Sequence, residues 1–345
     1  MGLYEQEGIL GMSQVDGSRS TGEQFLEFQR PPERQSVEAV DLAPVRPGSR
    51  IVRIAILLAI LTFLSTFLAG VTNWAPSFAM ARSWELASLL PMRLSVLANW
   101  EGGLQFSIAL MGILAAHEFG HYVLTVYYRV PSTPPLFIPF PISSIGTCGA
   151  VIAMQGGEAD RRQIFDIGLA GPIAGLLVAI PVMMYAMWHP QPMEYVPYKL
   201  MSMGNPLAVQ WMAQWLVPSQ ASQYVSMLNT EASPLMMAAW VGLLVTGLNM
   251  MPIGQLDGGH VAFGLLGPRS VWLGTAVLIA SAAYMAYFMV PVFLLMLILV
   301  FVMGPRHPPS RDDTRQLGWP RQIVGWLSLC IPLLCIPANP IMTLP

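Results

Sequence analysis

Charged residues are scarce in this chain of 345 residues. Asp, Glu, Lys and Arg make up 10% of the sequence, whereas about 25% is usual in soluble globular domains. Hydrophobic residues make up 54%, and a chain with so little charge must expose much apolar surface to lipid. The net charge of −2 shows no basic excess that would attract nucleic acid. We therefore expect the lipid bilayer as a partner, and no nucleic acid.

Cysteine is scarce as well, and the first residues lack an apolar core. Cys148, Cys330 and Cys335 form no CxxC pair, which excludes a disulfide framework and favours apolar thiols buried in the membrane. Residues 1–50 mix Gly, Ser, Pro and charged residues, so they do not resemble a signal peptide. We predict a disordered cytoplasmic tail over 1–50 and a membrane domain over 51–345.

Long apolar runs follow the tail. Several are long enough to cross a bilayer core of about 30 Å at 1.5 Å per residue. Residues 270–303 suffice for two crossings with a break at Pro291, and 323–337, short and rich in proline, is taken as a further span. The pattern predicts an all-α polytopic membrane protein with about six to seven transmembrane helices. The expected runs are 51–71, 104–128, 164–188, 233–251, 270–303 and 323–337.

The basic residues between these runs predict the orientation. Of the 17 Lys and Arg residues, 14 fall in alternate segments that begin with the tail. Arg82, Arg93 and Lys199 are the three in the other segments. Because cytoplasmic segments carry the excess of basic residues, we expect a multi-pass protein with a cytoplasmic N-terminus. The membrane is expected to be a bacterial inner membrane. The segments expected inside are 1–53, 129–163, 252–270 and 304–321; those expected outside are 72–103 and 189–232.

Two connections have unusual composition. Residues 129–163 are too rich in Pro and Gly for a helix and too apolar for a free loop, which predicts a short β-hairpin that dips into the membrane. Residues 189–232 are amphipathic and carry Trp211 and Trp215. These features favour a helix lying along the membrane interface.

The strongest chemical motif is HEFGH, formed by His117, Glu118 and His121 near one end of the second apolar run. Two His at i and i+4 share a helix face, so both imidazoles can reach one metal ion, and the adjacent Glu can reach a metal-bound water. Ionisable groups inside a membrane helix are costly, at roughly 2.5–3.5 kcal/mol each on insertion scales. Their grouping therefore favours a metal site over a buried polar patch.

Hydrolytic zinc sites use three protein ligands and keep a position for water. The candidate for the third ligand is Asp257 in NMMPIGQLDGGH, residues 249–260. It lies between Pro252 and a Gly-Gly pair, where the chain can leave a helix and turn its carboxylate toward a neighbour. The predicted orientation brings HEFGH and Asp257 to the same side of the membrane.

Together the two motifs resemble the site-2 protease family, the M50-type intramembrane zinc metalloproteases. The likeness rests on HEFGH, on Asn249 followed by Pro252, and on Leu256-Asp257-Gly258. The stretches FIPFP…GTCGAVI and RRQIFDIGLAGPIAG are similar to the chloroplast and bacterial branch. The resemblance covers roughly residues 104–265 and implies a three-helix catalytic core with peripheral helices.

The resemblance also implies roles for individual residues. His117, His121 and Asp257 would ligate one Zn²⁺ per chain, and Glu118 would be the catalytic base. Asn249 would help to position the substrate or the oxyanion. The implied function is hydrolysis of peptide bonds in single-span transmembrane proteins, as in regulated intramembrane proteolysis.

Two departures from the family stand out. Many members carry Asn where this chain has Gly175 in GPIAG, so the packing of that helix is expected to differ. Many bacterial members also contain a PDZ domain, for which this chain has no sufficiently long polar run.

Two other functions explain part of the pattern. A metal transporter or channel would account for polar groups inside helices, but not for Glu beside the first His of HEFGH. A catalytically inactive relative would usually lack His or Glu, and both are present.

Substrate binding is predicted for the hairpin itself. Prolines before it lack the N–H that a helix needs, while Gly146 and Gly149 permit a tight turn and close backbone approach. A strand edge around Ala150 could accept an unwound substrate as an added strand. The alternative is a hairpin that only fills space.

Remaining polar residues are given structural roles. Asp166 is expected to pair with Arg161 or Arg162 at the membrane edge. His260 is a candidate supporting residue near Asp257, and His307 is expected to be an ordinary loop histidine.

Overall fold

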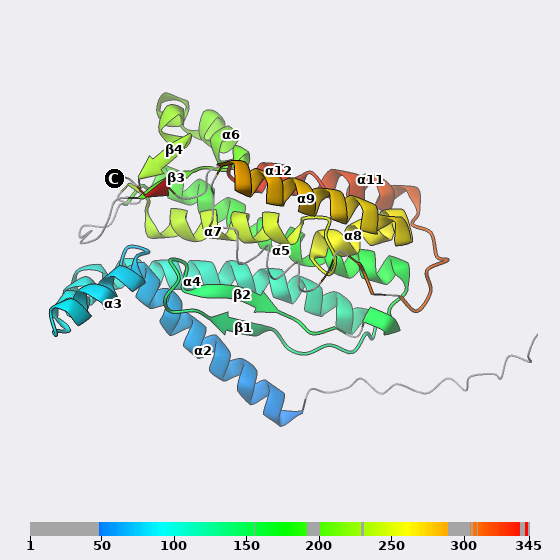
Figure 1. Cartoon of the computed structure of the whole chain (residues 1–345), viewed down its shortest axis with the longest axis horizontal. Helices are drawn as coiled ribbons and strands as arrows, with labels where there is room; N and C mark the ends of the chain where they lie inside the picture. Colours follow the sequence, from blue (N-terminus) through cyan, green and yellow to red (C-terminus); the bar gives the residue numbers. More distant parts are fainter. Residues whose placement is uncertain are drawn as a thin grey trace, which may run out of the picture. The chain divides into compact units, whose positions relative to one another are not determined.

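Helices dominate the structure, a computed structural model in which the fold class expected from the sequence is confirmed in outline (Figure 1). Apart from its last three residues, the predicted tail 1–50 lies outside the described part of the chain. The structure describes residues 48–154, 156–191, 201–228, 231–288, 304, 306–308, 310–338 and 342–343.

Four helical segments are long and apolar enough to cross a membrane. They are α2 (Ser49–Val71), α4 (Leu90–Tyr127), α5 (Arg161–Trp188) and the run Asp257–Tyr287. That run comprises α8 (Asp257–Leu266), the short 3₁₀ turn η3 (Gly267–Arg269) and most of α9 (Ser270–Phe288). A fifth apolar helix, α7 (Pro234–Asn249), has only 16 residues. The second crossing predicted within 270–303 lies outside the described residues.

The second helix is longer than the sequence predicted. It begins at Leu90 rather than near residue 104, with a kink where Asn99 leaves helical geometry at φ −120° and ψ 16°. The side-chain amide of Asn99 donates a hydrogen bond to the Val71 carbonyl at 3.1 Å. A polar contact with the end of α2 therefore accompanies the bend. The helix α3 (Pro76–Glu85) connects these two segments.

The stretch 323–337, predicted as a further span, is not one continuous helix. Two short helices occupy this region, α11 (Trp319–Ser328) and α12 (Ile331–Cys335). Pro332 stands in the first turn of α12, and because it lacks an amide hydrogen it cannot continue the helix before it.

Short strands form two small sheets. The predicted hairpin is confirmed as an antiparallel pair of β1 (Leu136–Pro139) and β2 (Thr147–Val151). A second sheet has the strand order β4-β3-β5. The helix expected to carry Trp211 and Trp215 lies between β3 and β4 in the sequence. The elements of this region are β3 (Met201–Gly204), α6 (Leu207–Leu216), η2 (Pro218–Tyr224), β4 (Ser226–Leu228) and β5 (Met342–Thr343).

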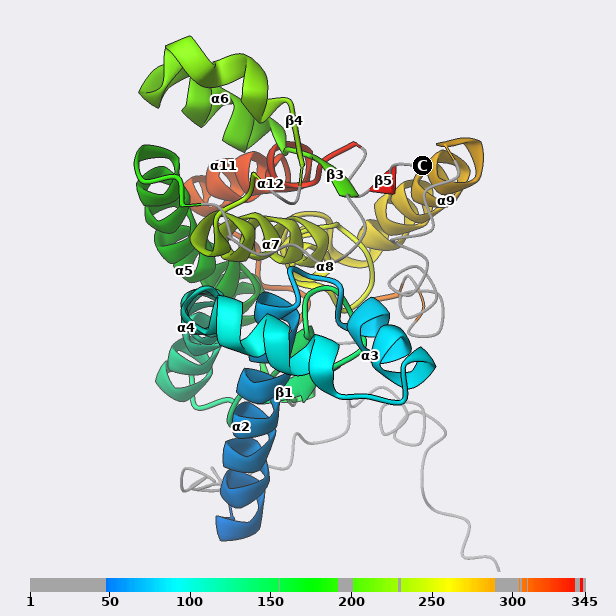
Figure 2. The same ribbon diagram turned by 90° about the vertical axis from the view of Figure 1, so that its left-hand side faces the viewer.

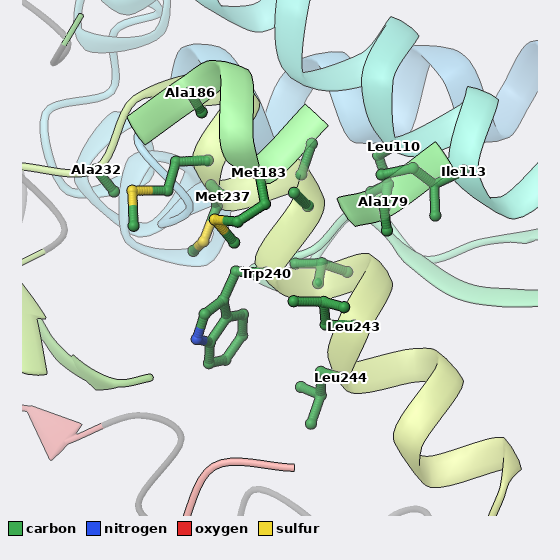
Figure 3. Close-up of a cluster of buried hydrophobic side chains, with 14 of the residues drawn as sticks. Leu110, Ile113, Ala179, Met183, Ala186, Ala232, Met237, Trp240, Leu243 and Leu244 are labelled. Carbon is green, nitrogen blue, oxygen red and sulfur yellow. The ribbon is translucent and has the colours of Figure 1, made fainter. Parts of the chain in front are cut away.

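Three helices form the centre of the bundle. The helices α4, α5 and α7 pack against one another and run side by side in Figure 1, whereas the hairpin packs mainly on α2. Figure 3 shows the buried apolar side chains where these helices meet, among them Trp240 and Met237 of α7 and Met183 of α5. Small residues let α7 approach its neighbours, because an added Cβ on Gly242 would lie 2.7 Å from Ile113.

Candidate metal centre

The helix α4 carries the HEFGH motif on its protein-facing side. His117, Glu118 and His121 are only 2%, 5% and 9% exposed. The two imidazoles are four residues apart, so they stand one helical turn from each other, with ring centroids 5.0 Å apart. Burying three ionisable groups is costly unless they have partners, and those partners come from α5, α7 and α8.

A tight turn brings Asp257 to the same place. The chain leaves α7 at Asn249 and re-enters a helix with Asp257 as the first residue of α8. The turn folds so closely on itself that a Cβ added to Gly258 would lie 2.0 Å from the Met250 carbonyl oxygen. Only glycine allows this approach, which is the structural reason for the Gly-Gly pair after Asp257.

The three expected ligands converge on one point. Nε2 of His117 lies 3.1 Å from Oδ2 of Asp257, and Nε2 of His121 lies 3.3 Å from Oδ1. The three candidate ligand atoms lie within 4.8 Å of one another. Two imidazole nitrogens and a carboxylate oxygen suit zinc, and three protein ligands leave a position for water. The residues present therefore fit the zinc ion that this donor set implies.

The helix α5 supports His121 through its backbone. Nδ1 of His121 lies 2.7 Å from the Ile167 carbonyl oxygen, so Nδ1 can donate there and leave Nε2 as the metal-facing atom. One turn further on, a Cβ added to Gly171 would lie 2.0 Å from Nε2 of His121. The absence of a side chain at Gly171 therefore makes room for the candidate ligand.

His117 has a different environment. Its Nδ1 is buried and has no hydrogen-bond partner among the described residues. A Cβ added to Gly175 would lie 3.2 Å from this Nδ1 and 3.5 Å from the Thr246 hydroxyl. The position where many relatives carry Asn thus lies directly beside a candidate ligand.

Two further predicted site residues lie next to the ligands. Glu118 interacts electrostatically with His117, His121 and Asp257. Asn249 is the last residue of α7, and its Nδ2 lies 3.4 Å from Nε2 of His117. The structure therefore brings Glu118 and Asn249 together with the three candidate ligands.

The hairpin residues have separate environments. The Gly146 carbonyl accepts hydrogen bonds from the Ser65 hydroxyl at 2.5 Å and from the Phe140 amide at 3.1 Å, and its own N–H donates to Ser143. Gly149, at φ +98°, donates its N–H to the Thr147 hydroxyl at 3.0 Å. Both glycines thus use these backbone groups inside the protein. Ala150 pairs with Phe137 of β1.

The expected partner of Asp166 is wrong. Arg321 of α11 forms a two-pronged ion pair with it at 2.8 and 2.9 Å, and the Tyr128 hydroxyl donates to it at 2.6 Å. Arg161 and Arg162 instead donate to backbone carbonyls, because helix ends and loops leave such acceptors free. Hydrogen bonding to Asp166 raises the pKa of Arg321 above its usual value, so the guanidinium stays charged and links α11 to α5.

His307 has a role that the sequence did not indicate. Its Nε2 lies 2.7 Å from Nδ1 of His260, and its ring stacks on Phe263 with centroids 4.1 Å apart. One nitrogen of the pair must donate and the other accept, and burial lowers the pKa of His307 and favours its neutral form. No motif surrounds His307 in the sequence, so only the fold identifies it as the partner of His260.

Comparison with known proteins agrees with this geometry. The model of peptidase family M50 matches residues 105–298, more than half of the chain. Probable zinc metalloprotease EGY1, chloroplastic, from Arabidopsis thaliana is 26% identical over 242 residues, 69% of this chain and 43% of that protein. EGY2 from the same plant is 26% identical over 215 residues, 61% of this chain and 38% of that protein. Both relatives are named as probable zinc metalloproteases.

The match has clear limits in length. The chain spans about two fifths of the length of these curated relatives, and no solved structure matches it. The matched region contains both halves of the metal centre, HEFGH and Asp257. With its long apolar helices the chain is an integral membrane protein, and it belongs to peptidase family M50, the zinc metalloprotease family of the site-2 proteases.

Proposed function

We propose that this protein is an intramembrane zinc metalloprotease that cleaves single-span membrane proteins, as in regulated intramembrane proteolysis. The observation that carries the proposal is the meeting of His117, His121 and Asp257 beside Glu118 in one buried site. A metal transporter would need ligands, but not a carboxylate next to them that is suited to activating water. The proposed catalytic core covers about residues 104–265 of a membrane domain over 51–345.

The chemistry divides between the ion and the protein. His117, His121 and Asp257 would hold zinc, which when bound supplies a Lewis acid and lowers the pKa of water from 15.7 to about 7. Glu118 would accept the proton of the attacking water and return it to the leaving amine. Asn249, beside His117, would donate its amide hydrogens to the developing oxyanion.

The substrate would bind along the hairpin. A substrate helix must unwind to expose a peptide bond, and an added strand can replace the hydrogen bonds that it loses. Among the described strands, β2 pairs only with β1, so β2 retains one edge. Because Gly146 and Gly149 use backbone groups internally, we assign the pairing to the edge around Ala150, with the glycines shaping the turn.

The orientation is proposed from the basic residues. The N-terminal tail, proposed to be disordered, and the segments 129–163 and 304–321 would face the cytoplasm of a bacterial cell, across its inner membrane. With α7 and a further crossing after α9 the spans would number six, and α11 together with α12 would add a seventh.

Replacing Glu118 with Gln tests the activity. The variant should keep zinc and lose most proteolysis, roughly 10²- to 10⁴-fold, because the amide accepts no proton. Membrane proteomics comparing it with the unaltered protein should show a single-span protein that accumulates. Near-normal turnover in the variant, or no proteolysis by the unaltered protein, would contradict the proposal, the second result in favour of a transporter.

A proline at position 150 tests the strand edge. Ala150→Pro removes one backbone donor, and cleavage should fall while zinc content and folding persist. Ala150→Val keeps that donor and serves as the matched control. Normal cleavage by a folded, zinc-containing proline variant would show that the substrate does not pair there.

Labelling from outside the cell tests the orientation. In a variant without the three native cysteines, a cysteine at Ser219 should react with an impermeant reagent, and one at Ser310 should not. Recovery of the protein with the inner-membrane fraction checks its location. The reverse labelling pattern would invert the proposed topology.

A further inference from the structure

A large apolar cavity lies away from the metal centre. It has a volume of about 960 Å³ and lies between α9, the end of α7 and the helices α11 and α12. Leu273, Val277 and Tyr284 line it from α9, and Leu329 and Leu333 line it from the opposite side. We call this space the α9 groove.

The groove exists because α9 leaves the bundle. Among the described elements, α9 packs mainly on α8 and η3 near its start, and Figure 2 shows it diverging from α7. Apolar cavities are poor sites for water, which needs two to four polar partners. Because α9 belongs to a run long and apolar enough to span a membrane, the acyl chains of lipids can occupy the groove.

One end of the groove carries a buried polar side chain that has no partner in the described part of the chain. Asn205, just after β3, lines the groove and is 3% exposed, and its Oδ1 and Nδ2 have no hydrogen-bond partner among the described residues. Its backbone is fixed, since its N–H donates to Val225 at 3.1 Å and its carbonyl accepts from Gln210 at 2.8 Å. An unpaired buried amide costs about 1–3 kcal/mol, so this position favours a ligand with polar atoms.

We propose that the α9 groove binds a membrane glycerolipid, with an acyl chain along α9 and the ester or hydroxyl groups on the side-chain amide of Asn205. The amide can donate to an ester carbonyl and accept from a hydroxyl. Such a ligand is polar at one end and apolar along its body, as the groove is.

The chemistry of Asn205 separates a lipid from a membrane helix. A transmembrane helix satisfies its own backbone groups and presents apolar side chains outward, so it would leave the amide unpaired. A lipid brings polar groups and needs no unfolding to enter from the bilayer. The groove also reaches Met251 and Pro252, in the turn that leads to Asp257, so a bound lipid would touch the segment that carries the candidate ligand.

Photocrosslinking in lipid bilayers tests the site. The full-length protein is reconstituted with phosphatidylglycerol that carries a diazirine in one acyl chain, and labelled peptides are mapped by mass spectrometry. Labels should concentrate on the lining residues of α9 and α12. Ala280→Trp fills the groove from α9, whereas Ala283→Trp, exposed on the same helix outside the lining, is the matched control.

The variants give distinct expected results. Labelling of α12 should fall several-fold in Ala280→Trp and roughly fivefold in Asn205→Leu, the loss of about one hydrogen bond, and should stay unchanged in Ala283→Trp. Equal labelling in all four proteins would mean only annular lipid and would overturn the proposal. So would crosslinking of an apolar model helix in the groove with no lipid label. Proteolysis is not the readout, so failure here is separate from failure of the proposed activity.

Discussion

The helices α7 and α9 are both apolar around their whole circumference, yet they have opposite surroundings. Twelve of the sixteen residues of α7 are buried against protein. Along α9, only Ser270 and Gly274 are buried among the residues whose side chains are described, while Trp272 and Ile279 are 77% and 64% exposed. Similar composition therefore leads to a central helix in one case and a peripheral helix in the other.

The difference follows from the solvent. In lipid an apolar side chain gains little by moving from hydrocarbon to protein, so close packing and polar contacts decide which helices associate. The helix α7 has Gly242 against Ile113, a Trp240 indole N–H that donates to the Gly204 carbonyl at 3.1 Å, and Asn249 beside the metal centre. Beyond its first turns, α9 leaves these contacts and borders a groove.

The largest effect is expected where the packed helices hold the metal. Asp257→Ala should lower zinc affinity by more than the roughly 10- to 100-fold that is typical of losing a residue that only hydrogen-bonds to a ligand. The purified variant should therefore contain no zinc. Metal analysis of the purified protein checks this, against about one zinc per chain in the unaltered protein. Asp313→Ala, in an exposed segment, is the control. Full zinc occupancy without Asp257 would exclude it as the third ligand.

A smaller but specific effect is expected from the helix that faces the ligands. Gly171→Ala adds a Cβ that would lie 2.0 Å from Nε2 of His121. The added carbon should displace the imidazole and so weaken zinc binding. Gly112→Ala, in α4, meets nothing within 4 Å and should leave zinc affinity unchanged. Zinc titration of both variants measures the difference. Equal affinities would mean that α5 does not constrain His121.

Within α7, loss of packing should lower stability. Leu243 is 0% exposed, and Leu243→Ala should cost about 2–5 kcal/mol, the usual range for a buried leucine. Thermal unfolding in detergent, followed by a single probe, gives the shift in midpoint. An unchanged midpoint would show that the core around α7 is looser than its burial indicates.

The smallest effect is expected on the exposed side of α9. Ile279→Ala removes a side chain that is 64% exposed and does not line the groove, so unfolding stability should change by no more than about 0.5 kcal/mol. The same thermal measurement applies. A loss as large as that of Leu243→Ala would reveal a protein partner on this face and remove the contrast between the two helices.

Several features could be predicted because they are local. The i, i+4 spacing of His117 and His121 requires only a helix, and the apolar runs around them predict one. Prolines and glycines between 129 and 163 indicated the hairpin for the same reason, since backbone restrictions act within a few residues. The convergence of Asp257 on HEFGH was expected from topology and family resemblance together.

Other features depend on contacts that local patterns do not encode. The sequence placed Asp166 near Arg161 and Arg162, but Arg321, 155 residues away, is its partner, because the nearer arginines bind backbone carbonyls instead. His307 had no motif and became the partner of His260 only when its segment returned to α8.

The sequence by itself determined that the chain lies in a membrane, that α4 carries a pair of histidines spaced to reach one metal ion, and that a hairpin follows. Composition and short-range spacing suffice for these conclusions. The tertiary structure alone decided that α7 is enclosed and α9 is not, and that the Asn205 side chain lines an apolar groove with no hydrogen-bond partner among the described residues. The physical reason is that hydrocarbon and protein interior are nearly equivalent to an apolar side chain, so only the packing of distant segments distinguishes them.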